Sequence, residues 1–201
     1  MMGNLRAIWR REVRQAKRVA SVLMESNKIK FGWRSLLLPF FISDAIRYQR
    51  SLHQTRKNLL FTKQLAFNAA RNVHKGKEPA WEFRQIEIKT QEILDKEKKG
   101  FYSGKIRHKQ LLIIDFLMNH YLDLINTGAS TYPTMIKASH SKKGTYLAFL
   151  NRLQKIEAEV IQVAVTSMRK GSKKERRLWF DKLTATTKKI RAKEADRIYN
   201  E

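Results

Sequence analysis

A row of basic side chains near the start of the chain is the clearest candidate for chemistry. Its members lie three or four residues apart, so a helix would place them on one stripe about 16 Å long. They are Arg6, Arg10, Arg14 and Lys17. Guanidinium groups suit phosphate oxygens better than ammonium groups do. The stripe therefore predicts a surface for nucleic-acid phosphates or for an anionic bilayer; a solvated face on a packed helix is the structural alternative.

The segment 28–50 combines basic, aromatic and apolar residues in an order typical of docking on a membrane surface. Cations flank an apolar run, and aromatic side chains stand at its edge. The phosphate- or headgroup-binding candidates here are Arg34, Arg47 and Arg50. The docking candidates, one of them from the first helix, are Trp9, Phe31, Trp33, Leu36, Leu37 and Leu38. A core-filling segment beneath a loop would have the same composition.

A third basic group lies near the C-terminal end of the sequence, directly before two aromatic residues, Trp179 and Phe180. Its members are Lys173, Lys174, Arg176 and Arg177. Cations next to aromatic rings suit phosphate binding with base stacking. A charged first helical turn beside two core aromatics is the alternative.

Two carboxylates, Glu12 and Glu157, fall within the apolar faces of their helices. A buried carboxylate needs a partner, and among many basic residues we expect ion pairs. His120 and Asp123 stand three residues apart, but one such pair is a weak metal motif. No repeated Glu-x-x-His, phosphate loop or nucleophile elbow is present. The sequence therefore predicts no catalytic residue, metal site or cofactor, and a protein that is not an enzyme.

Three prolines and eight glycines leave long uninterrupted stretches, which favours helices. We predict an all-α fold, an irregular bundle of five or six helices around a central apolar helix at about 105–126. The chain reads as a single domain, 1–201, with a basic amphipathic helix at 1–25 and a tail that frays over 195–201. The other helices are expected at about 44–74, 79–99, 144–169 and from 172 onward, with a short helix or turn at 131–140.

The charge balance constrains the partners more than the activity. Lys and Arg total 42 against 18 Asp and Glu, a net charge of +24 over 201 residues. Some lysines adjoin glycines, at 74–77, 98–100, 142–144 and 170–171, where they predict helix C-termini with glycine caps. Those positions do not explain the shortage of acids. An anionic partner would offset the self-repulsion of such a chain.

The first functional hypothesis is a non-enzymatic protein that binds nucleic-acid phosphates, with RNA slightly favoured. The second is a peripheral protein of an anionic membrane, and the third is a subunit or scaffold with an acidic protein partner. No apolar run is long enough to span a bilayer, and the first residues lack a secretory signal. With no cysteine present, we expect a cytoplasmic protein, membrane-associated in the second hypothesis, with the mitochondrial matrix a minor alternative.

Overall fold

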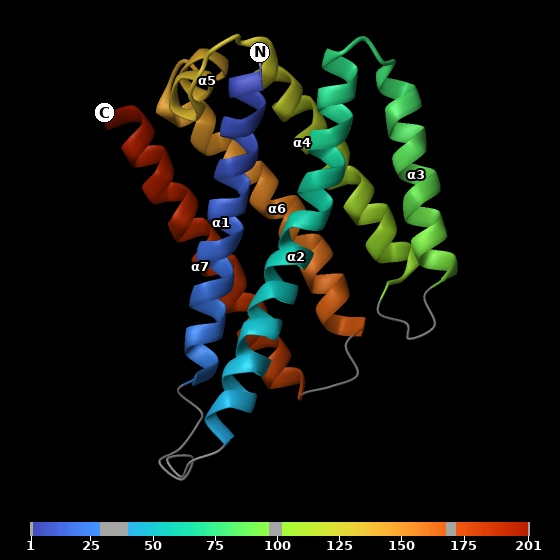
Figure 1. Cartoon of the computed structure of the whole chain (residues 1–201), viewed down its shortest axis with the longest axis vertical. Helices are drawn as coiled ribbons and strands as arrows, with labels where there is room; N and C mark the ends of the chain where they lie inside the picture. The colour runs from blue at the N-terminus through green and yellow to red at the C-terminus, as the bar shows by residue number, and fades with distance from the viewer. Residues whose placement is uncertain (1, 29–39, 97–101, 168–171, 201) are drawn as a thin grey trace.

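The computed structural model describes residues 2–28, 40–96, 102–167 and 172–200, and most of these residues are helical. The described residues form seven α-helices and no strand, which confirms the all-α prediction (Figure 1). The additional helix, beyond the five or six expected, is Tyr132–Ser139, in the segment expected as a short helix or turn. The helices are α1 (Met2–Lys28), α2 (Phe40–His74), α3 (Pro79–Asp95), α4 (Gly104–Asn126), α5 (Tyr132–Ser139), α6 (Lys143–Ser167) and α7 (Lys173–Asn200).

Helix α4 is the centre of the bundle, as its apolar sequence predicts. It packs against α1, α2, α3, α5 and α6. Its fully or nearly fully buried side chains include Ile114, Leu117 and Leu124. Ser103 caps its N-terminus by accepting a hydrogen bond from the backbone N–H of Ile106, which satisfies one of the otherwise free donors. The central helix thus provides the apolar wall against which the polar groups of the other helices are set.

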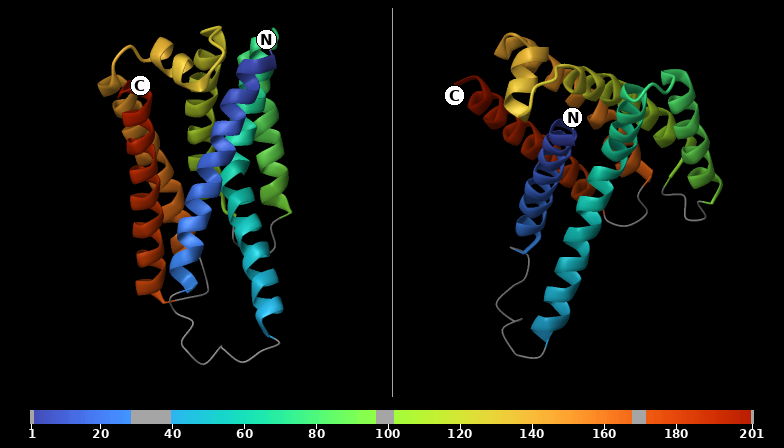
Figure 2. Two further views of the ribbon diagram at one scale, coloured as in Figure 1. Left: turned by 60° about the vertical axis from the view of Figure 1, so that its left-hand side comes forward. Right: turned by 45° about the horizontal axis from the view of Figure 1, so that its top comes forward.

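Helices α1 and α7 lie side by side and run in opposite directions (Figures 1 and 2). Arg11 and Gln15 of α1 both bond to Glu194 of α7. Further along α1, Val19 joins the smaller apolar cluster that contains Leu183. On its other side α7 packs on α6, and α1 packs on α2. Four helices therefore converge around the side chains described below.

The C-terminal segment is part of the core, so the expected fraying from residue 195 is wrong. Helix α7 continues through Asn200, and Ala195 and Ile198 are buried. The phenol hydroxyl of Tyr199 donates a hydrogen bond to the backbone carbonyl of His140. Apolar residues spaced three apart within an otherwise charged tail hold it against α5 and α6.

The prediction that lysine–glycine pairs end helices holds at one place and fails at another. Gly76 has φ +94°, and its N–H bonds to the carbonyl of Val73 at the end of α2. This is the left-handed cap that glycine favours. Gly144, by contrast, lies in the first turn of α6, where Lys143 forms an ion pair with Asp196 (2.9 Å). The pairs at 98–100 and 170–171 lie outside the described residues.

Candidate functional site

The basic stripe of α1 lies on the outside of the bundle. Its four predicted members are exposed, and so is Arg18, one turn after Arg14. Within the part of the chain that the structure describes, none of these five side chains takes part in an ion pair. The opposite side of the helix is occupied, because Ile8, Ala16 and Val19 are buried. The exposed side of α1 is therefore basic over the described residues, with Val22 as its one exposed apolar side chain.

Helix α7 extends this charge across a shallow groove between the two helices. The groove is lined by Arg14, Lys17, Arg18, Ser21, Val22 and Ile190. Exposed Lys189 and Lys193 adjoin Ile190 on α7. We call the combined set the α1–α7 basic surface; it comprises Arg6, Arg10, Arg14, Lys17, Arg18, Lys189 and Lys193. The spacing of basic residues predicts the α1 part of this surface but not its continuation onto α7.

The third basic group lies elsewhere on α7. Lys174 and Arg177 are exposed at the start of that helix, the end remote from Lys193 (Figure 1). The side chains of Lys173 and Arg176 lie outside the described residues.

Of the proposed membrane-docking residues, Trp9 alone lies within the described part of the chain. Arg34, Phe31, Trp33, Leu36, Leu37 and Leu38 lie outside the described residues, as do the side chains of Arg47 and Arg50 on α2. Trp9 is placed: its ring stacks on Phe67 of α2 with 5.6 Å between ring centroids. Trp9 therefore contributes to packing between α1 and α2.

Beneath the surface, Glu12 anchors a buried group of charges. Its carboxylate is 2% exposed and accepts hydrogen bonds from Lys63 of α2 and from Arg11. The ion pair expected for this residue is thus confirmed. Burial alone would raise the pKa of Glu12, but the Lys63 ammonium and the Arg11 guanidinium hold it far below its usual range.

Arg11 is buried, although a helical wheel of α1 places it next to the exposed basic residues. It is 5% exposed, and its guanidinium bonds to both oxygens of Glu194 and lies 4.8 Å from the ring centre of Tyr132. Burial opposes its charge, but Glu194 and Glu12 more than compensate, so the pKa of Arg11 is raised. Its partner lies 183 positions away, which a helical wheel cannot indicate.

Glu157 forms the second predicted ion pair, with Arg191 of α7. The pairing is bidentate, with N–O distances of 2.7 and 2.8 Å. Burial would raise the pKa of Glu157, and the adjacent guanidinium lowers it below the usual value. The Nε of Arg191 is buried and has no partner among the described residues. Three buried or partly buried ion pairs therefore cross-link four helices. They join α1 to α2 (Glu12–Lys63), α1 to α7 (Arg11–Glu194) and α6 to α7 (Glu157–Arg191).

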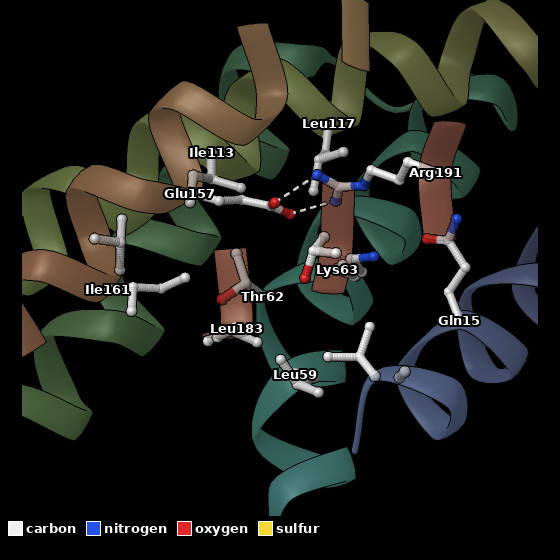
Figure 3. A pocket seen from close by; sticks show the side chains of 14 residues that line it. Gln15, Leu59, Thr62, Lys63, Ile113, Leu117, Glu157, Ile161, Leu183 and Arg191 are labelled. Atoms are coloured by element: carbon white, nitrogen blue, oxygen red, sulfur yellow. Dashed lines mark hydrogen bonds and ion pairs between the residues drawn. The ribbon is translucent and has the colours of Figure 1, made fainter. Parts of the chain in front are cut away.

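A pocket of about 190 Å³ adjoins these charges between five helices (Figure 3). Its lining residues are Gln15, Ala16, Val19, Leu59, Thr62, Lys63, Ile113, Leu117, Glu157, Val160, Ile161, Leu183, Thr187 and Arg191. The lining mixes apolar side chains with the two ion-paired cations. No sequence pattern indicates this pocket, since it arises only where five separate helices meet.

The possible metal pair is not supported by its surroundings. Within the described residues no group of three or more His, Cys, Asp or Glu side chains could hold a metal ion. His120 is buried with its ring stacked on Phe149, 4.0 Å between centroids. Burial, with a smaller contribution from His140, lowers the pKa of His120 to about 3, so the imidazole is neutral.

The chain matches no protein-family model, and neither a curated protein nor a solved structure is significantly similar to it. None of the helices in the described ranges is long and apolar enough to cross a membrane.

Proposed function

We propose that this protein is a non-enzymatic nucleic-acid-binding protein that holds phosphates on the α1–α7 basic surface, with RNA as the first candidate. The observation that carries the proposal is the exposed row of Arg6, Arg10, Arg14, Lys17 and Arg18, which has no carboxylate partner among the described residues. Unpaired arginines spaced along a helix suit a polymer that carries phosphates at regular intervals.

The packing of α1 favours a nucleic acid over a bilayer for this surface. A helix that lies on a membrane buries its apolar face in the lipid. In α1 that face is already buried in the bundle at Ile8, Val19 and Ala20, and Trp9 stacks on Phe67. The exposed side chains among the described ones of α1 are the five basic residues of the row and Val22, so the surface can attract phosphates and offers a single exposed apolar side chain for insertion.

Salt dependence measures the number of phosphates held. Contact between a single strand and the four-residue stripe predicts a slope of log K against log salt of about −3. Fluorescence anisotropy with a labelled mixed-sequence RNA, and then with single-stranded DNA, between 50 and 200 mM salt would give this slope. A slope near zero, or no binding of either strand, would contradict the proposal.

Two charge-reversal variants locate the binding surface. Arg10→Glu with Arg14→Glu changes the stripe, and Arg84→Glu with Lys89→Glu makes the same change of net charge on exposed positions of α3. We expect the first variant to weaken RNA binding by more than about tenfold and the second by less than about threefold at low salt. Equal losses would mean that the charge acts diffusely. Liposome binding without RNA binding would favour the membrane alternative instead.

A further inference from the structure

In the pocket between α1, α2, α6 and α7, polar side chains lie at one height along the helix axes and apolar side chains at another. We call these two groups the polar level and the apolar level. On α1, Gln15 precedes Val19 by one turn, and on α6 Glu157 precedes Ile161 by one turn. On α2 and α7 the order is reversed, with Leu59 before Lys63 and Leu183 before Arg191. Because α1 and α6 run opposite to α2 and α7, the polar members share one level (Figures 1 and 3).

The apolar level is formed by the side chains one to two turns away. In the view of Figure 3, Leu59, Ile161 and Leu183 lie apart from the Glu157–Arg191 pair, across the pocket. Helix α4 adds Ile113 and Leu117, so its contribution is apolar throughout. A pocket built in this way suits a molecule with one polar end and an apolar body.

The polar level has spare donors, while each oxygen of its two carboxylates already accepts a hydrogen bond. Both oxygens of Glu157 accept from Arg191, and both oxygens of Glu12 accept from Arg11 and Lys63. The Lys63 ammonium has three N–H donors and uses one on Glu12.

A further donor belongs to α7, since no hydrogen bond is formed by the Thr187 hydroxyl within the described residues. A ligand group that accepts hydrogen bonds would therefore be favoured over one that only donates them.

We propose that this pocket binds a small amphipathic carboxylic acid, with its carboxylate at Lys63 and Arg191 and its apolar body between Leu59, Ile161 and Leu183. Carboxylates make their strongest hydrogen bonds with such cations. The surrounding charge of +24 favours an additional anion in a cluster whose own acids and bases balance. A cavity of about 150 Å³ holds benzene with its six carbons, so about 190 Å³ suits an acid of roughly six to eight carbons.

Calorimetric titration of the full chain with octanoate, 1-octanol and octylamine tests the ligand class. The three share one apolar chain and differ in the head group. We expect saturable one-to-one binding of octanoate with a dissociation constant below about 1 mM, which is ordinary for a ligand of ten non-hydrogen atoms. Octanol should bind at least about tenfold more weakly and octylamine not detectably. Equal affinity for octanoate and octanol, or no binding of octanoate, would overturn the proposal.

A pair of tryptophan variants tests the location. Ile161→Trp fills the apolar level, and Ile88→Trp places the same ring on an exposed position of α3. We expect the first variant to abolish octanoate binding and the second to leave it unchanged, with folding checked by circular dichroism. Should Ile161→Trp fail to fold, the smaller change Ile161→Phe should still weaken octanoate binding. A folded variant at residue 161 that binds like the wild type would place the octanoate site elsewhere and refute the proposal.

Discussion

Replacing Glu12 by Gln should destabilise the protein far more than the loss of an ordinary surface charge. The carboxylate is 2% exposed and is shared by Lys63 and Arg11. Glutamine keeps the shape but removes the charge that compensates a largely buried ammonium. Breaking a buried ion pair from one side costs about 3–5 kcal/mol, because the remaining charge is left uncompensated.

The corresponding change in Tm follows from the size of the chain. An unfolding entropy of about 2.1 cal/mol/K per residue gives roughly 0.4 kcal/mol/K for 201 residues. A loss of about 3–5 kcal/mol therefore lowers Tm by about 7–12 °C. Differential scanning calorimetry at pH 7 measures this directly, with Glu159→Gln as the matched control. Glu159 also pairs with a lysine, Lys109, but on the surface, so its replacement should change Tm little.

The double variant Glu12→Met with Lys63→Met separates burial from charge. Both members of the pair are then replaced by apolar side chains of similar length. A buried pair replaced as a unit commonly costs little, so at least half of the loss in Tm should be recovered. If Glu12→Gln lowers Tm by less than about 3 °C, or the double variant is less stable than the single one, the reasoning about this ion pair is refuted.

Two further predictions concern the buried charges and the C-terminal helix. The pKa of Glu157 is depressed in the folded state, so its contribution to stability is present above the unfolded value of about 4.3 and is lost as pH falls below it. Tm should therefore stay nearly constant from pH 7 to 5 and fall below about pH 4, and the fall should be smaller in Glu157→Gln. Ile198→Ala should cost about 2–5 kcal/mol in chemical denaturation, because the side chain is 1% exposed. The exposed neighbour Arg197→Ala should change the unfolding free energy by less than about 0.5 kcal/mol, and equal effects would indicate a frayed tail.

Features that depend on local spacing could be predicted from the sequence. The apolar character of residues 105–126 indicated the central helix, and the positions of Glu12 and Glu157 on apolar faces indicated buried ion pairs. In each case the periodicity of a single helix contains the information. The same applies to the exposed arginines of α1.

Features that depend on the meeting of distant helices could not be predicted. Arg11 lies at the edge of the apolar face, and only Glu194 of α7 explains its burial. The position of Trp9 on α1 suits membrane docking as well as packing, and only Phe67 of α2 identifies it as a packing residue. The pocket needs five helices at one level, and the basic surface needs α7 beside α1. Helical periodicity gives directions around an axis, but it does not identify the neighbour.

The pairing of α1 with α7 affects how the protein can fold during synthesis. Arg11 and Glu194 are separated by 183 positions. Because ribosomes add about 5–20 residues per second, Glu194 is synthesised roughly 10–40 s after Arg11. Over that time α1 can pack on α2 through Glu12 and Lys63, but its side facing α7 remains open to water. The nascent chain thus exposes an additional arginine and an incomplete polar cluster until α7 emerges and closes the bundle.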